Sequence, residues 1–122
     1  MLSAQNLKIT FNHGTPIETR ALQGLSLDIP TGQFVTVIGT NGAGKSTFLN
    51  AVSGDLSVDS GKLLIDDEDV TRLPVWSRAS RVARVFQDPM AGTCEDLTIE
   101  ENMALAQQRG QAIEEIVTHM LI

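Results

Sequence analysis

The residues with the clearest chemistry lie in one glycine-rich segment. Residues 39–46 read Gly-Thr-Asn-Gly-Ala-Gly-Lys-Ser and fill every fixed position of the phosphate-binding pattern GxxxxGK[ST]. Glycines let the backbone turn tightly and aim successive amide hydrogens at phosphate oxygens, and a following helix adds its positive end. The segment predicts a nucleoside triphosphate site; the alternative is a glycine-rich turn that only caps a helix.

Within this loop, each kind of residue has an expected role. Lys45 is expected to place its ammonium on the β and γ phosphates, and the Ser46 hydroxyl to take one position in a Mg²⁺ shell. Thr47 is a further hydroxyl nearby. The predicted phosphate ligands are Gly39, Asn41, Gly42, Ala43, Gly44, Lys45, Ser46 and Thr47.

The segments around the loop occur in the order strand, loop, helix that the pattern requires. Residues 34–38 form a β-rich apolar run, which predicts a buried strand, and residues 46–52 form an amphipathic stretch, which predicts a helix. Other strands are expected in runs bounded by turn formers, at residues 7–11, 25–29 and 62–65.

Downstream, residues 74–83 suit a short helix with Val75, Ala79 and Val82 on one side. Several arginines crowd this region, and they are expected to form a solvated face or to pair with the acidic turn at 66–69 rather than to bind phosphate. They are Arg72, Arg78, Arg81 and Arg84.

The rest of the chain alternates short elements with turns. Residues 85–87 read as a strand that ends at Asp88-Pro89. Thr98 and Glu101 fit a capping box, which opens a helix through residue 106. Apolar residues at helical spacing predict a second amphipathic helix within residues 107–122.

Composition narrows the class of protein. The 122 residues are enough for one domain, and 42% apolar and 20% charged residues with a net charge of −6 indicate a soluble globular protein without a bias toward nucleic acid. No apolar run is long enough to cross a bilayer or to act as a signal peptide, so a cytoplasmic protein is expected. Cys94 is the single cysteine, which excludes an internal disulfide.

Three stretches together resemble the amino-terminal half of an ATP-binding-cassette (ABC) ATPase, the nucleotide-binding subunit of membrane transporters. They are the strand pair before the loop at 21–34, the loop itself at 41–47, and the segments 85–89 and 97–102. The last two segments are similar in sequence to the family's glutamine loop and to the start of its helical subdomain. The resemblance covers residues 1–106 and implies an α/β fold of the P-loop NTPase type: a partial ABC ATPase domain with an antiparallel β subdomain and C-terminal helices.

The resemblance also implies roles for two residues outside the loop, with ATP and Mg²⁺ as cofactors. Gln87 would reach the Mg²⁺ and the attacking water, and Phe11 would stack against the adenine as an aromatic ring without a hydroxyl. Taken without the family, Gln87 is a polar residue at a strand end and Phe11 is a core strand residue.

The later motifs of the family are not found after Gln87: the LSGGQ signature, the second acidic motif with its catalytic glutamate, and the switch histidine. Asp66, Asp67 and Glu68 follow an apolar run but are expected to form a turn rather than the acidic pair that holds Mg²⁺. His119 is expected to be exposed to solvent, and His13, in a turn with Asn12 and Gly14, is expected to belong to no ligand cluster.

The leading hypothesis is a chain that binds Mg-ATP as the Walker A half of an ABC transporter ATPase, with little or no hydrolysis alone. The alternatives are a non-catalytic folding or dimerisation module with weak nucleotide binding and a small P-loop phosphotransferase. The expected partners are permease subunits of the parent family and a second copy of a truncated or engineered chain, at the inner face of the membrane but not inserted in it.

Overall fold

The structure is a computed structural model that describes residues 1–107. The chain divides into two units, Met1–Arg78 and Ala79–Ile122, and each is described by itself. The amphipathic helix expected within 107–122 lies, apart from Gln107, outside the described residues, as does His119.

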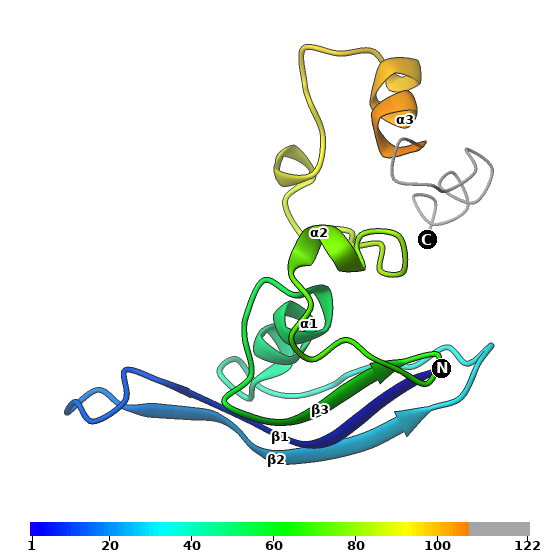
Figure 1. Ribbon diagram of the computed structural model, residues 1–122. Coiled ribbons are helices and arrows are strands. Elements are labelled where there is room, and N and C mark those ends of the chain that lie inside the picture. Colours follow the sequence, from blue (N-terminus) through cyan, green and yellow to red (C-terminus); the bar gives the residue numbers. More distant parts are fainter. Residues whose placement is uncertain (108–122) are drawn as a thin grey trace. The chain divides into compact units, whose positions relative to one another are not determined.

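The first unit is built on a four-stranded antiparallel sheet with the strand order β2-β1-β3-β4 (Figure 1). The strands expected at residues 7–11, 25–29 and 62–65 are confirmed, and β1 and β2 extend beyond their alternating cores because they pair along their length as a hairpin. The strands are β1 (Leu2–Phe11), β2 (Thr19–Ile29), β3 (Ser60–Ile65) and β4 (Glu68–Asp69).

Helix α1 (Lys45–Ser53) contacts β2 and contributes to the core of this unit. Its residues Phe48 and Ala51 are buried, as are Leu7 and Ile9 of β1. The helix ends at Gly54, whose φ of 93° is the left-handed conformation that glycine adopts most easily. The expected helix after the phosphate loop is therefore confirmed.

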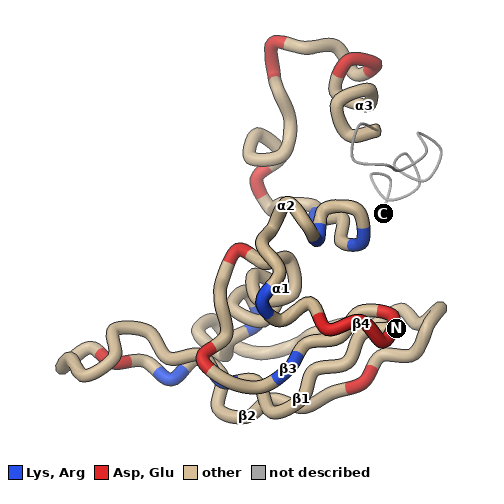
Figure 2. Tube along the Cα trace, in the orientation of Figure 1, with Lys and Arg blue, Asp and Glu red and all other residues tan. Residues whose placement is uncertain are grey.

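The acidic segment between β3 and β4 is a tight turn. Asp66 and Asp67 have positive φ values of 49° and 64°, which is the backbone pattern of two-residue hairpin turns. Figure 2 shows acidic residues along the chain at this turn and at β4. Asp66 Oδ1 accepts a hydrogen bond from the Met1 ammonium at 2.8 Å. The turn interpretation of these aspartates is confirmed.

The strand expected at residues 34–38 is not formed, so that prediction was wrong. Phe34 is 86% exposed and Ile38 90% exposed. A strand exists only where a neighbour completes its backbone hydrogen bonds, and none of the described residues pairs with this segment.

The helix expected at 74–83 is also shorter and differently buried than predicted. Helix α2 covers only Val75–Arg78, Val75 is exposed, and the buried residue is Arg78, which is 3% exposed. The expectation that Arg78 forms part of a solvated face or pairs with the acidic turn was therefore wrong.

Arg78 is buried because backbone carbonyls take up its donors. Its Nη1 donates to the carbonyl oxygens of Ala51 at 2.6 Å and Val52 at 3.1 Å, at the C-terminal end of α1. Its Nε and Nη2 donate to the carbonyl oxygens of Leu73 at 3.0 Å and Thr71 at 3.2 Å. One guanidinium thus joins the end of α1 to the segment that precedes α2, and its charge complements the negative end of the helix.

In the second unit, the strand expected at 85–87 is absent, because no described strand lies beside it to complete a ladder. A short 3₁₀ turn, η1 (Pro89–Ala91), and helix α3 (Ile99–Gln107) are present. The capping box is confirmed: Thr98 N donates to Glu101 Oε2 at 2.9 Å and Glu101 N donates to Thr98 Oγ1 at 3.2 Å. Across residues 1–107, no helix has both the length and the apolar character needed to span a membrane.

Candidate phosphate-binding site

The glycine-rich loop leads directly into α1 without a side-chain cap. Gly42 and Gly44 have φ values of 85° and 95°, and Gly44 is the residue just before the helix. The first helical hydrogen bond runs from Phe48 N to Gly44 O at 2.9 Å. The left-handed conformation explains why the pattern requires glycine at position 44, and the additional glycine at 42 adopts the same conformation.

The first amides of the helix remain available to a ligand. No described residue accepts a hydrogen bond from the amides of Gly42, Gly44, Lys45 or Ser46, while the Ala43 amide donates to Thr40 O at 3.1 Å. Unpaired amides at a helix N-terminus attract anions because the partial positive charge of the helix is concentrated there. The arrangement is suited to phosphate oxygens.

The Lys45 side chain folds back over the loop. Its Nζ donates to Gly39 O at 2.5 Å and to Thr40 O at 2.7 Å. These carbonyls hold the ammonium at the loop, from which it can exchange a neutral acceptor for a charged phosphate oxygen. Ser46 is exposed and Thr47 is half-buried.

For Mg²⁺, the protein supplies few donors. Among residues 1–107 no group of three or more His, Cys, Asp or Glu side chains is placed to hold a metal ion. The Ser46 hydroxyl is exposed at the start of α1, next to the free amides, and a hard cation that keeps several waters and phosphate oxygens needs only one or two such protein ligands. The residues present fit Mg²⁺ bound together with a triphosphate.

The loop is positioned by strand β2. A methyl group on Gly44 would lie 2.8 Å from Ala21 O and 3.3 Å from Leu22 Cδ2, so the loop backbone approaches β2 more closely than any other residue type would allow. Phe11 pairs with Thr19, two residues along β2 from Ala21. The first unit therefore carries both the phosphate loop and the aromatic residue expected at the adenine.

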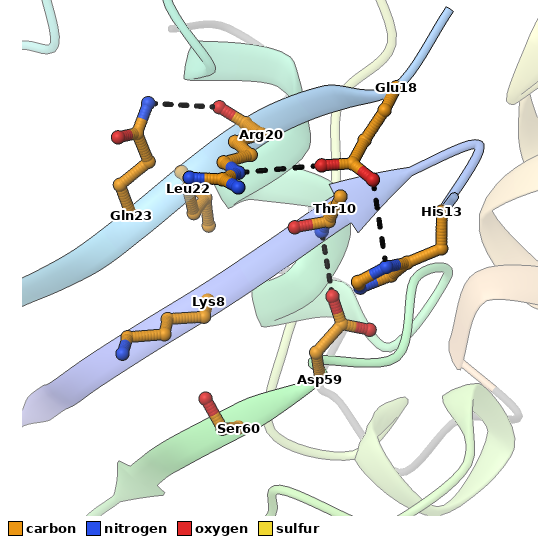
Figure 3. A pocket seen from close by; sticks show the side chains of 9 residues that line it. All are labelled: Lys8, Thr10, His13, Glu18, Arg20, Leu22, Gln23, Asp59 and Ser60. Atoms are coloured by element: carbon orange, nitrogen blue, oxygen red, sulfur yellow. Dashed lines mark hydrogen bonds and ion pairs between the residues drawn. The ribbon is translucent and has the colours of Figure 1, made fainter. Parts of the chain in front are cut away.

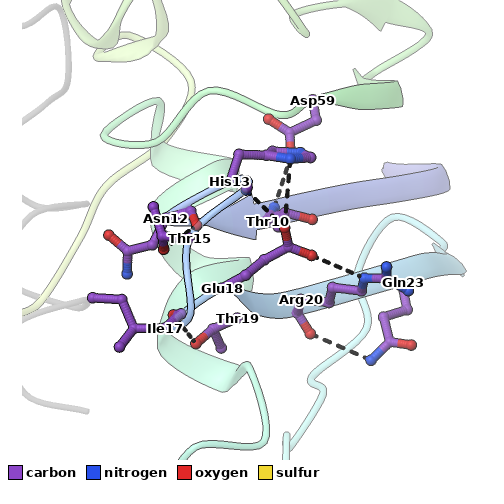
Figure 4. Close-up of polar contacts among 11 residues, drawn as sticks. Thr10, Asn12, His13, Thr15, Ile17, Glu18, Thr19, Arg20, Gln23 and Asp59 are labelled. Carbon is purple, nitrogen blue, oxygen red and sulfur yellow. Dashed lines mark hydrogen bonds and ion pairs between the residues drawn. The ribbon is translucent and has the colours of Figure 1, made fainter.

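The hairpin that follows Phe11 is held by its own hydrogen bonds (Figure 4). Thr15 Oγ1 donates to Asn12 O at 2.6 Å, and Gly14 N donates to Glu18 Oε2 at 2.9 Å. Arg20 Nε donates to Glu18 Oε1 at 3.4 Å. Glu18 thereby ties the turn to strand β2.

The Gly14 amide lowers the pKa of Glu18 below its ordinary value, and Arg20 acts in the same direction. Because the folded pKa is depressed, the bond is fully present above the ordinary glutamate pKa of about 4.3 and is lost as pH falls through the lower folded value. We expect the Gly14 amide resonance to titrate in an NMR pH series with a midpoint below the ordinary glutamate pKa, and Glu18→Gln to abolish that titration. A midpoint at or above the ordinary value would contradict the role of this bond.

Gln87 lies in the second unit, exposed and in a segment without helix or strand. Its role at the Mg²⁺ and the attacking water stays a prediction.

Two structural residues were missed by the sequence reasoning. No local sequence pattern distinguishes Arg78 from the other arginines nearby. It is the last residue of the one-turn helix α2, and its side chain is buried. Asn102 lies directly after the capping-box glutamate, and its side chain holds the preceding loop: Oδ1 accepts from Cys94 N at 2.9 Å and Nδ2 donates to Cys94 O at 3.0 Å. Neither residue carries a motif.

The sequence model of the ABC transporter family matches residues 22–122. The chain belongs to this family. The tyrosine transport ATP-binding protein of Clostridioides difficile (strain R20291) is 41% identical to it over 113 residues, which are 93% of this chain and 45% of that protein. The energy-coupling factor transporter ATP-binding protein EcfA1 of Streptococcus pyogenes (serotype M1) is 33% identical over 118 residues, 93% of this chain and 42% of that protein.

Solved structures agree with this assignment. The dimeric structure of MJ0796, a bacterial ABC transporter cassette, has a TM-score of 0.77 at 28% identity and covers 92% of this ABC chain and 49% of that chain. A dimeric post-hydrolysis state of the same cassette, bound to ADP and phosphate, has a TM-score of 0.74 at 29% identity, over 87% of this chain and 46% of that chain. The described fold corresponds to one part of an ABC ATPase cassette. The chain spans less than half the length of these relatives.

Proposed function

We propose that this chain binds Mg-ATP as the Walker A half of an ABC transporter ATPase. The observation that carries the proposal is the glycine loop before α1: it has left-handed glycines, no side-chain cap, and amides at 42 and 44–46 that no described residue accepts. Its lysine is held at the same loop.

Each residue has a defined task in this proposal. The amides of the loop bind the phosphate oxygens, and Lys45 Nζ leaves the carbonyls of Gly39 and Thr40 to pair with the β and γ phosphates. Ser46 Oγ ligates the Mg²⁺, which neutralises phosphate charge when bound. Phe11 stacks on the adenine with its ring face.

Hydrolysis by this chain alone is expected to be close to background. Turnover needs a residue that orients the attacking water and a clamp on the transition state. In the parent family the clamp is completed by the signature loop of a second subunit, and no such motif occurs in this sequence. A coupled phosphate-release assay should show no rate above that of buffer with Mg-ATP.

The direct test is calorimetric titration with Mg-ATP. We expect Lys45→Ala to weaken binding by about 100-fold or more, because two charge-assisted hydrogen bonds to phosphate, each worth roughly 1.5–3 kcal/mol, are lost. Lys62→Ala is the matched control, since it removes an exposed strand lysine with the same charge. Equal affinities of the Lys45 variant and the unchanged protein would exclude the phosphate loop as the site.

A folding or dimerisation module with weak nucleotide affinity is the second candidate, favoured by the exposed apolar segment at 34–38. This segment leads directly into the loop, and without strand neighbours it supports the loop weakly. Saturable binding that Lys45→Ala weakens only a few-fold would favour this candidate.

The proposed partners follow from the relatives. The similar cassettes are described as dimeric and as parts of transporters, so we propose that this chain acts with a second cassette and with permease subunits at the cytoplasmic face of a membrane. Light scattering across a wide concentration range tests self-association.

A further inference from the structure

A cavity lies over strands β1 and β2, outside the residues of the phosphate loop (Figure 3). Its volume is about 400 Å³, within the range of small-molecule sites. None of residues 39–47 lines it, and all of its lining residues except Leu22 are polar. They are Lys8, Thr10, His13, Glu18, Arg20, Leu22, Gln23, Asp59 and Ser60.

Irregular strand pairing builds this pocket. Lys8 and Thr10 alternate with the buried Leu7 and Ile9, so they belong to the face of the sheet opposite the core. The register of β1 against β2 shifts between Leu7 and Lys8 and again between Ile9 and Thr10. Such shifts re-aim side chains and increase the local twist.

The carboxylates of the pocket already have partners. Glu18 uses one oxygen for the Gly14 amide at 2.9 Å and the other for Arg20 Nε at 3.4 Å. Asp59 immediately precedes β3, and its Oδ2 accepts a hydrogen bond from Thr10 N at 2.7 Å. These contacts hold the β1–β2 turn and the start of β3 in place around the pocket.

The two cationic side chains of the pocket keep donors that no described residue uses. No described residue accepts a hydrogen bond from Lys8 Nζ, and Arg20 donates only through Nε, which leaves Nη1 and Nη2 free. The Ser60 hydroxyl also has no partner among residues 1–107. In Figure 3, Arg20 and Glu18 point toward each other, while Lys8 extends along β1 and Ser60 lies at the start of β3; all four residues line the pocket.

We propose that this pocket binds a small organic anion bearing a carboxylate or phosphate group, held by Lys8 and Arg20. A guanidinium with two free nitrogens matches the two oxygens of such a group, and the ammonium adds a point charge. The anion is small because the cavity is about 400 Å³, and it is a second ligand, bound independently of the nucleotide.

Site-resolved NMR tests this proposal, with succinate and inorganic phosphate as the two probes. Saturable shifts are expected at the backbone amides of the pocket strands, with a dissociation constant on the order of 1 mM for at least one probe. Lys8→Gln combined with Arg20→Gln should weaken binding about tenfold or more, because both charged donors are removed. Both side chains are exposed, so the fold should persist, as circular dichroism would verify.

Two controls distinguish this site from the phosphate loop. Lys62→Gln removes an exposed lysine of β3 outside the pocket and should leave the affinity unchanged, and Lys45→Ala should also leave it unchanged. Shifts confined to residues 39–46, shifts that never saturate, or equal affinity in the double variant would overturn the proposal. None of these results bears on whether the loop binds Mg-ATP.

Discussion

Replacing Arg78 by methionine is expected to lower the free energy of unfolding of this chain by about 3–5 kcal/mol. The substitution keeps most of the side-chain volume but leaves four backbone carbonyls, at residues 51, 52, 71 and 73, without the guanidinium that satisfies them. The positive charge at the end of α1 is lost as well. Urea unfolding followed by circular dichroism measures the change.

Two further variants show what Arg78 contributes. Arg72→Met is the control, because Arg72 is exposed and its hydrogen bond to Val58 O is long, at 3.5 Å; its effect should stay within about 0.5 kcal/mol. Arg78→Lys keeps the positive charge but not the planar guanidinium. Its loss in free energy of unfolding should lie between those of Arg72→Met and Arg78→Met. A loss below about 1 kcal/mol for Arg78→Met would mean that water replaces the guanidinium without cost.

The second large effect is expected for Gly44→Ala, which should both destabilise the fold and remove nucleotide binding. Alanine at a φ of 95° is strained by about 1–2 kcal/mol, and its methyl group would also lie 2.8 Å from Ala21 O, a backbone atom that cannot move without β2. The loop must shift away from the strand, and its amides then no longer converge. Thermal unfolding and Mg-ATP titration measure the two parts.

Gly42→Ala separates strain from collision. Gly42 has a similar φ of 85°, but an added methyl group would meet nothing within 4 Å. In the absence of nucleotide, Gly42→Ala should therefore lower the free energy of unfolding only by the backbone strain, about 1–2 kcal/mol. If Gly42→Ala and Gly44→Ala lower the free energy of unfolding by the same amount, the contact between the loop and β2 does not position the site.

Local patterns were sufficient for the elements whose partners are near in sequence. Alternation in residues 7–11 and 25–29 predicted two strands, and their hairpin pairing completes both. The glycines of the loop and the Asp66-Asp67 turn were predicted because positive φ favours specific residue types. The capping box was predicted because its two residues, Thr98 and Glu101, lie only three positions apart in the sequence.

Two features that depend on distant partners were predicted incorrectly. The run at 34–38 has the composition of a strand buried on both faces, but composition does not supply neighbours. Arg78 was assigned to the surface because arginine is mostly exposed, and only the fold shows that the carbonyls at the end of α1 converge on it.

For the site, the sequence predicted which residues form the phosphate loop, and the structure adds how they are held. The close contact of Gly44 with Ala21 O and the folding of Lys45 onto Gly39 O depend on the position of β2, which no motif encodes. The polar pocket has no sequence pattern at all, since its residues come from β1, β2, the turn that joins them, and residues 59–60 at the start of β3.

The exposed run at 34–38 also bears on how the protein behaves in concentrated solution. Residues 33–40 contain no charge and no proline, and valine, threonine and isoleucine dominate the stretch. An uncovered backbone of that composition is a template on which identical chains stack into fibrils. Storage in dilute, low-temperature samples, and expression alongside chaperones that hold extended chains, would preserve soluble material.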